Sequence, residues 1–294
     1  MKKIVYITGC LGFIGSYVTR ACLKKGWYVR GIDKVTYASN IKLLDEFEKN
    51  PNFVFEREDI NNIKFLYECD YIINTAAETH VGNRNYRGEG KDKPTLLHFS
   101  TDEVYGDVTD GEHLETDILK PSNPYSATKA AADQLILAWA RTYNLPYVIV
   151  RPTNNYGIGQ YTEKLIPKTC KCLSLGKKIP LHNNGSPIRN WLHASDTAEA
   201  IITIIESNIQ NEIYNIAGGF EQANFDTVQK VITEYTREDI DLHDYIDLSY
   251  SRAGQDVRYA LNDNKLKNLG WKSKRLFDYE LPKIVKYYKK NFIW

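Results

Sequence analysis

The stretch Ile4-Val5-Tyr6-Ile7-Thr8-Gly9-Cys10-Leu11-Gly12-Phe13-Ile14-Gly15 decides the fold of this 294-residue chain. Its first five residues predict a buried strand, and the GxxGxxG glycines open a predicted helix that runs to about Lys25. Glycines let the backbone approach a pyrophosphate closely, and the free N–H groups at a helix N-terminus attract it. The stretch therefore predicts the first unit of a dinucleotide-binding fold.

A carboxylate follows at the distance that such a fold requires. The next apolar run, residues 28–32, ends at Asp33, eighteen residues after Gly15. A carboxylate there accepts hydrogen bonds from the adenosine ribose and repels a 2′-phosphate, which favours NAD over NADP. In the alternative interpretation the glycines only allow tight packing, and Asp33 is a solvated turn residue.

Short β-branched runs alternate with helical stretches through the first half of the chain. Further strands are predicted at residues 53–55, 71–74, 96–99 and 147–150. Near-continuous apolar strands between helices predict a parallel sheet covered on both faces, a Rossmann-type doubly wound α/β fold. We expect an NAD-binding domain over residues 1–152, continued by returning segments near 190–217.

The second half, residues 153–294, is expected to form mostly a smaller mixed α/β substrate-binding lobe. It predicts helices near 165–175, 226–236 and 277–289 and a strand at 213–216.

Tyr125 and Lys129 carry the first chemical signal. At a spacing of four residues on an alanine-rich helix they share one face, so the ammonium is expected to lower the pKa of the phenol and make Tyr125 a general base. A YxxxK pair alone is weak in a chain with 21 tyrosines, and its position one crossover after a predicted strand strengthens it.

That strand leads into Ser100-Thr101-Asp102-Glu103-Val104-Tyr105-Gly106, at the sheet edge where open α/β folds bind their ligands. Two adjacent carboxylates in one site can have their pKa values pushed apart, which gives one acid and one base. In the alternative interpretation Asp102 and Glu103 are solvated residues at a strand exit.

Composition excludes several classes of partner. Lys and Arg number 38 against 37 for Asp and Glu, so no overall charge favours nucleic acid or an anionic membrane. No apolar run is long enough to span a bilayer, and Met1-Lys2-Lys3 leads straight into a strand, so we expect a cytoplasmic protein. The spacing of Cys170, Cys172 and His182 does not favour a metal site, and we expect none.

The chain resembles the extended short-chain dehydrogenase/reductases, and within them the dTDP-glucose and UDP-glucose 4,6-dehydratases. The resemblance rests on the glycine turn, Asp33, the YxxxK pair, Ser100 to Gly106, Asp59-Ile60 and Ala76-Ala77-Glu78-Thr79-His80-Val81, and it continues through residues 151–157, 163–167, 187–192, 214–219 and 252–259. The Thr101-Asp102-Glu103 triplet is its most specific element, because related sugar epimerases carry no such acid pair.

The resemblance implies a three-stage cycle with tightly held NAD. Tyr125, assisted by Thr101 and Lys129, would take the proton of the sugar 4-hydroxyl while hydride leaves C4. Glu103 would then remove the C5 proton, and Asp102 would protonate the departing 6-hydroxyl. Hydride returning to C6 gives a 4-keto-6-deoxy sugar nucleotide, as in deoxysugar biosynthesis.

The resemblance also assigns binding residues. The cofactor would contact Gly9, Gly12, Phe13, Ile14, Gly15, Asp33, Lys34, Asp59, Ile60, Ala76, Ala77, Thr79, Ser100, Tyr125 and Lys129. The nucleotide-sugar substrate would contact Thr101, Asn155, Lys164, Leu165, Arg189 and Arg258. Lys and Arg suit a diphosphate because they donate charged hydrogen bonds to its oxygens.

One region departs from the family pattern. Parallel strands ending near Thr75 and starting near Thr95 need a crossover, usually a helix, yet residues 82–94 are polar with three glycines and a proline. The family places there a helix that contacts the cofactor and forms half of a homodimer interface. Its loss predicts a weakened or rearranged dimer, a more open cofactor cleft and reduced activity; Ala253, where the family usually has Pro, is a milder change.

Two rival functions stay open at this stage. A nucleotide-sugar 4-epimerase would share Tyr125, Lys129 and NAD but leave Asp102 and Glu103 without a role. A catalytically silent NAD-binding protein would be compatible with the lost crossover. The sequence does not separate a dTDP from a UDP substrate, because their bases differ by one methyl group.

Overall fold

The computed structural model describes residues 2–63, 67–76, 93–238, 241–251 and 256–291. Its centre is a seven-stranded sheet in the order β10-β6-β5-β4-β1-β2-β3, and every pairing in it is parallel. The strands are β1 Ile4–Thr8, β2 Tyr28–Asp33, β3 Phe53–Arg57, β4 Tyr71–Asn74, β5 Thr95–Phe99, β6 Tyr147–Pro152 and β10 Glu212–Ile216. The predicted strands and the doubly wound α/β fold are confirmed.

The strand order reverses between β1 and β4. From β1 the chain moves through β2 to β3, and from β4 it moves the other way through β5 to β6. In such sheets ligands bind at the carboxyl ends of the strands, where the order reverses. Gly9, Thr75 and Ser100, which follow β1, β4 and β5, therefore meet at the edge where a ligand is expected.

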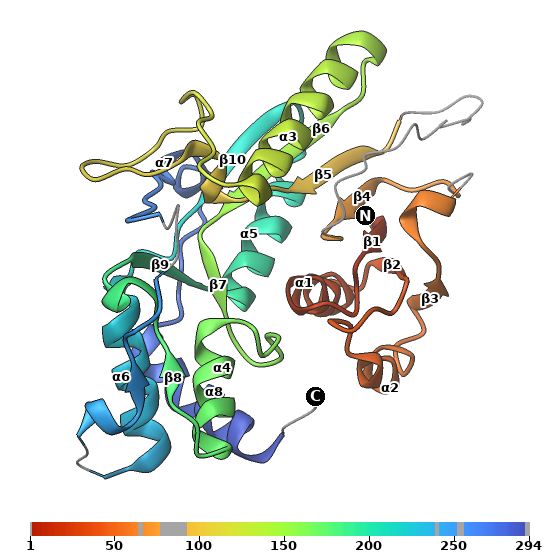
Figure 1. Cartoon of the computed structure of the whole chain (residues 1–294). Helices are drawn as coiled ribbons and strands as arrows, with labels where there is room; N and C mark the ends of the chain where they lie inside the picture. Colours follow the sequence, from red (N-terminus) through yellow and green to blue (C-terminus); the bar gives the residue numbers. More distant parts are fainter. Residues whose placement is uncertain (1, 64–66, 77–92, 239–240, 252–255, 292–294) are drawn as a thin grey trace.

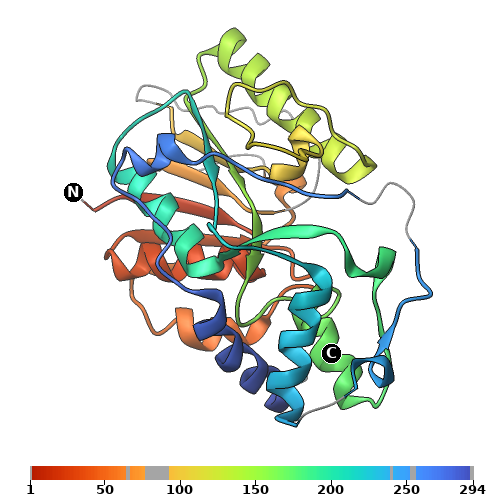
Figure 2. The ribbon, with the colours of Figure 1, turned by 90° about the vertical axis from the view of Figure 1, so that its left-hand side faces the viewer.

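Helices cover the sheet on both sides. α1 Phe13–Lys24 packs against α5 Ala194–Glu206, and α3 Pro124–Tyr143 follows β5 and packs near β6. Because right-handed crossovers running in opposite directions place their helices on opposite faces, α1 and α3 lie on different sides of the sheet, as Figure 2 shows. The short helices α2 Leu44–Phe47 and α7 Asn264–Lys267 complete this part.

The remaining elements form a lobe beside the sheet (Figure 1). Its helices α4 Leu165–Ser174, α6 Asn224–Thr236 and α8 Phe277–Lys290 pack against one another around buried aromatic side chains. Its strands form one three-stranded and one two-stranded sheet: β7 Asn154–Tyr156, β9 Ile188–His193 and β11 Glu221–Ala223, with β8 Ile179–Pro180 and β12 Ile246–Asp247. β10 returns to the main sheet next to β6, whereas β9 stays in the lobe.

The β4 to β5 pairing is parallel, as expected, with Tyr71 opposite Thr95. The short connection predicted between them falls mostly on residues 77–92, which lie outside the described residues, and so do Ala77, Thr79, Gly82 and Ala253. Among the helices that the structure describes, none is long and apolar enough to cross a bilayer.

Candidate active site

Two glycines of the turn, Gly9 and Gly15, have no room for a side chain. Gly9 has φ +72°, and a Cβ on it would lie 3.0 Å from the Ala76 nitrogen and from Thr75 Oγ1. A Cβ on Gly15 would lie 2.0 Å from the Gly9 carbonyl oxygen. The turn therefore packs directly on the end of β4, and Gly12 is the N-cap residue of α1.

Asp33 ties this turn to the loop after β2. One carboxylate oxygen accepts the Leu11 N–H at 3.1 Å, and the other accepts the Val35 N–H and the Ser39 hydroxyl, both at 2.8 Å. The side chain is buried. These bonds fix a carboxylate next to the glycine turn, as a bound ribose requires.

One cavity of about 730 Å³ connects these parts to the candidate catalytic residues. The residues named from the sequence that line it are Gly9, Gly12, Phe13, Ile14, Gly15, Asp33, Lys34, Asp59, Ile60, Ala76, Ser100, Thr101, Asp102, Glu103, Tyr125, Asn155 and Lys164. The glycine turn, the Asp33 carboxylate and the open volume between them fit a dinucleotide. NAD, when bound there, would supply a hydride acceptor and donor.

Other predicted residues lie elsewhere. Lys129 is buried and does not line the cavity, and Leu165 packs against the apolar cores of the lobe. Arg189 and Arg258 stand outside the lining. Arg258 forms a two-point ion pair with Glu221, with nitrogen to oxygen distances of 2.9 and 3.2 Å. A phosphate would have to share Arg258 with that carboxylate.

The sequence reasoning missed several lining residues: Thr36, Tyr37, Ala38, Ser39, Glu58, Thr75, Pro152, Thr153, Asn154, Gln160, Tyr161 and Glu163. Thr75 and Thr153 directly follow strands of the main sheet, so their position could have indicated them. Tyr37 and Tyr161 come from opposite parts of the chain, and their ring centroids lie 5.3 Å apart. No local pattern signals that pair.

Asp102 is the buried member of the acid pair. It begins a single 3-10 turn, Asp102–Tyr105, and accepts the Thr101 hydroxyl at 3.0 Å. Burial, and then the charge of Glu103, raise its pKa to about 7. Its second oxygen is buried without a hydrogen-bond partner among the described residues. Such a carboxyl can hold a proton at neutral pH and donate it.

Glu103 is partly buried and faces the same cavity. Its backbone N–H donates to Thr101 Oγ1 at 3.4 Å, and its carboxylate accepts the Asn123 amide at 3.3 Å. The pair thus consists of two acids in unequal environments on one short turn.

The expected effect of Lys129 on Tyr125 is wrong in this structure. The ammonium is buried and donates to the Phe99 carbonyl oxygen at 2.5 Å. Tyr125 is 51% exposed, and its partial burial, followed by the charges of Glu103 and Asp102, raises the pKa of the phenol to about 12. Helical spacing placed the two residues on one helix but could not show that a β5 carbonyl binds the lysine.

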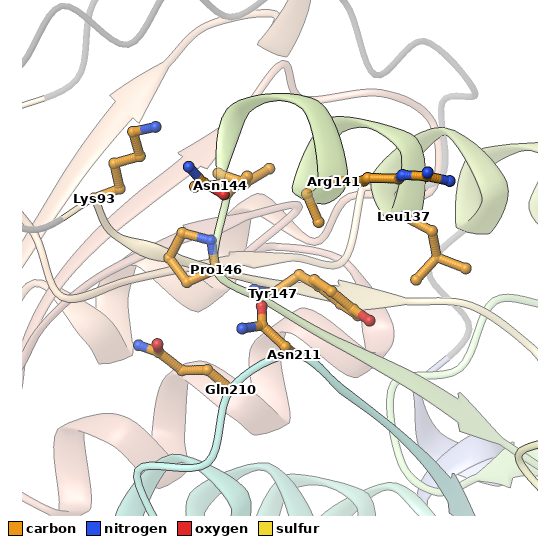
Figure 3. A pocket seen from close by; sticks show the side chains of 10 residues that line it. Lys93, Leu137, Arg141, Asn144, Pro146, Tyr147, Gln210 and Asn211 are labelled. Carbon is orange, nitrogen blue, oxygen red and sulfur yellow. Dashed lines mark hydrogen bonds between the residues drawn. The ribbon is translucent and has the colours of Figure 1, made fainter.

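A second cavity, of about 770 Å³, lies where α3 ends and β6 begins (Figure 3). Two of its polar side chains bind their own surroundings: Lys93 donates to the Tyr143 carbonyl, and Gln210 donates to Thr95 Oγ1 at 2.8 Å. It lies at the amino ends of the strands, away from the glycine turn and Tyr125. We therefore assign the chemistry to the first cavity.

No group of three or more His, Cys, Asp or Glu side chains that could hold a metal ion occurs in the described part of the chain. A dinucleotide site that opens onto a tyrosine and lysine helix is the architecture of the short-chain dehydrogenases/reductases. Comparisons with known proteins narrow this class.

Two family models match consecutive parts of the chain. Residues 6–89 match the GDP-mannose 4,6-dehydratase family, and residues 89–217 match the NAD-dependent epimerase/dehydratase family. The dTDP-glucose 4,6-dehydratase of Haemophilus influenzae is 36% identical, with 98% of both chains covered. That of Neisseria gonorrhoeae is 34% identical, with 99% of this chain and 96% of the relative covered. The chain belongs to the dTDP-glucose 4,6-dehydratase family, whose members are NAD-dependent hydro-lyases.

Solved structures agree. The dTDP-glucose 4,6-dehydratase of Bacillus anthracis, crystallised in complex with NAD, is 31% identical and has a TM-score of 0.85. The match covers 98% of this chain and 97% of that structure. A UDP-glucuronic acid 4-epimerase from Bacillus cereus reaches the same TM-score at 22% identity, a likeness of fold alone.

Proposed function

We propose that this chain converts dTDP-glucose or UDP-glucose to the 4-keto-6-deoxy sugar nucleotide. The observation that carries the proposal is the acid pair, Asp102 and Glu103, in the same cavity as Tyr125 and the glycine turn. An epimerase needs only a tyrosine base and a hydride carrier, so the carboxylates of Asp102 and Glu103 would have no catalytic role in it.

Each residue has a separate task in this proposal. Tyr125 takes the proton of the sugar 4-hydroxyl as the phenolate when C4 is oxidised, and the positive charge of bound NAD would favour the phenolate over the neutral phenol. The new ketone makes the C5 hydrogen acidic. Glu103 removes that C5 proton. Asp102 keeps a proton of its own near neutral pH and gives this second proton to the departing 6-hydroxyl. Water leaves, the hydride removed from C4 is returned to C6, and C5 gains a proton.

The binding residues divide between the two halves of the cavity. Gly9, Gly15 and Asp33 would hold the cofactor pyrophosphate and ribose, with Asp59 and Ile60 beside the adenine. Lys164 and Asn155, on the lobe side of the same cavity, would meet the substrate diphosphate.

Purified protein incubated in parallel with dTDP-glucose and UDP-glucose tests the proposal. Mass spectrometry of the products should show loss of one water from at least one substrate, and Tyr125→Phe should abolish it. An isomer of unchanged mass would make the protein an epimerase. Thr128→Ala, on the same helix with its hydroxyl bonded to a backbone carbonyl, is the matched control.

We further propose a cytoplasmic homodimer that is weaker than those of the family. The alignment with the N. gonorrhoeae relative runs over 334 residues, whereas this chain has 294, and a shorter connection between β4 and β5 would account for the difference. The family pattern places a crossover helix of the dimer interface in this connection, so a shortened connection would weaken the dimer. Sedimentation equilibrium showing a tight dimer through α3 would contradict this.

A further inference from the structure

Asn123 stands two residues before Tyr125 and caps α3. Its side-chain oxygen accepts the Ser126 N–H at 2.9 Å, and the Ser126 hydroxyl accepts the Asn123 N–H at 3.3 Å. This reciprocal capping fixes the first turn of the helix that carries Tyr125. It occupies only the oxygen of the Asn123 amide.

The nitrogen of the same amide joins two carboxylates. It donates to Glu103 Oε2 and to Asp256 Oδ2, each at 3.3 Å. An amide nitrogen carries two hydrogens, so it can serve both acceptors at once. Asp256 is buried and also accepts the Ser122 hydroxyl. One side chain therefore fixes Glu103 relative to the helix of Tyr125 and to a third acid.

Asp256 lies next to two of the candidate phosphate ligands, one from β9 and one from its own segment. Arg189 donates to the Asp256 carbonyl at 3.2 Å, and its guanidinium lies 5.1 Å from the ring centroid of Tyr259. Arg258 follows two residues after Asp256. The contacts of Asn123 thus connect the proposed C5 base to the part of the lobe that would hold the nucleotide.

We propose that Asn123 is a positioning residue that holds the Glu103 carboxylate in place for removal of the C5 proton and anchors it to Asp256. The inference rests on the proposed dehydratase function. Without the amide, Glu103 and Asp256 lose the donor between them, and two carboxylates that share no donor repel each other. The C5 base then moves, while Tyr125 and the oxidation at C4 are unaffected.

Two substitutions separate this role from helix capping. Asn123→Ser keeps a capping oxygen but removes the amide nitrogen, and Asn123→Asp keeps the size and the cap but places a third carboxylate between the two acids. Thr128→Ala, in the same helical turn but outside these contacts, is the control. Thermal unfolding of all four proteins shows that each is folded.

Single-turnover mixing with dTDP-glucose, or UDP-glucose if only that substrate reacts, should show oxidation at C4 at the wild-type rate in Asn123→Ser. Loss of water should slow about tenfold to a hundredfold, because a base displaced by about 1 Å costs this much. Reduced cofactor should therefore accumulate, as its absorbance would show, and Asn123→Asp should slow water loss further. Thr128→Ala should behave as the wild type.

Equal slowing of oxidation and water loss, or no slowing of either, would overturn the inference and leave Asn123 as a helix cap. A wild-type protein that oxidises neither sugar nucleotide, or releases no water, would instead overturn the proposed function and this inference with it.

Discussion

In the proposed mechanism, the environment of Asp102 sets the pH dependence of the reaction. Its pKa of about 7 means that the donating form is present below that pH and is lost as pH rises through it. We expect the rate of water loss to fall about tenfold for each pH unit above about 7. A pH profile of single-turnover water loss checks this; a rate that stays constant to pH 9 would exclude Asp102 as the acid.

Asp102 should also lower the stability of the fold at neutral pH. Its pKa is raised from 3.8 in the unfolded chain to about 7 in the fold. Its favourable contribution to the free energy of unfolding is therefore complete below pH 3.8 and is lost as the pH rises to about 7. Asp102→Asn removes this loss. Urea unfolding should therefore show the variant gaining roughly 2 to 4 kcal/mol over the wild type between pH 4 and pH 8, while water loss falls about 10²-fold or more. A stability difference that is the same at both pH values would contradict the assignment.

The sequence indicated which residues lie in the candidate site, but it did not indicate how their side chains contact one another. Asp102, Glu103 and Tyr125 do line one cavity. The bond from Lys129 to Phe99 and the double role of Asn123 depend on tertiary contacts between α3, β5 and the lobe, which residue spacing does not encode.

Among the elements, the glycine turn before α1 makes the most direct prediction. A methyl group on Gly15 would overlap the Gly9 carbonyl and Thr75 Oγ1, so Gly15→Ala must push α1 away from the end of β4. We expect NAD affinity to fall at least tenfold, as measured by titration calorimetry. Gly176→Ala is the control, because it has a left-handed φ of +61° but nothing near its added methyl group. Equal NAD affinity in both variants would contradict the role of the turn.

Long periodic elements could be predicted, and short ones could not. The strands of the main sheet and the helices α4, α6 and α8 lie close to their expected ranges because their apolar patterns are strong. Strands such as β8 and β12 have two residues each, too few for any periodicity. They exist because these two segments of the lobe pair with each other.

Across the whole molecule, a buried polar network joins helix, sheet and active-site turn. Arg151 on β6 donates to Asp133 of α3 at 3.0 Å and to the Tyr105 hydroxyl at 2.7 Å, and Asp133 also accepts the Ser100 hydroxyl at 3.0 Å. Tyr105 in turn donates to Asn215 of β10 at 2.8 Å. Arg151 and Asp133 are both buried, so each depends on the other for its charge.

Arg151→Met should therefore destabilise the fold by about 3 to 5 kcal/mol, because it leaves Asp133 charged and unpaired in the interior. Adding Asp133→Asn should restore part of that loss. Urea unfolding of the single and double variants measures both effects. A double variant that is less stable by the full sum of the single changes would show that the two residues do not act as a pair.

The central claim is that one cavity oxidises C4, eliminates water across C5 and C6, and reduces C6 without releasing the hydrogen. The direct test uses dTDP-glucose or UDP-glucose with deuterium at C4. NMR of the product should show that deuterium at C6 of a 4-keto-6-deoxy sugar, with a solvent hydrogen at C5. A product that keeps the 6-hydroxyl and carries the label at C4 would contradict the claim.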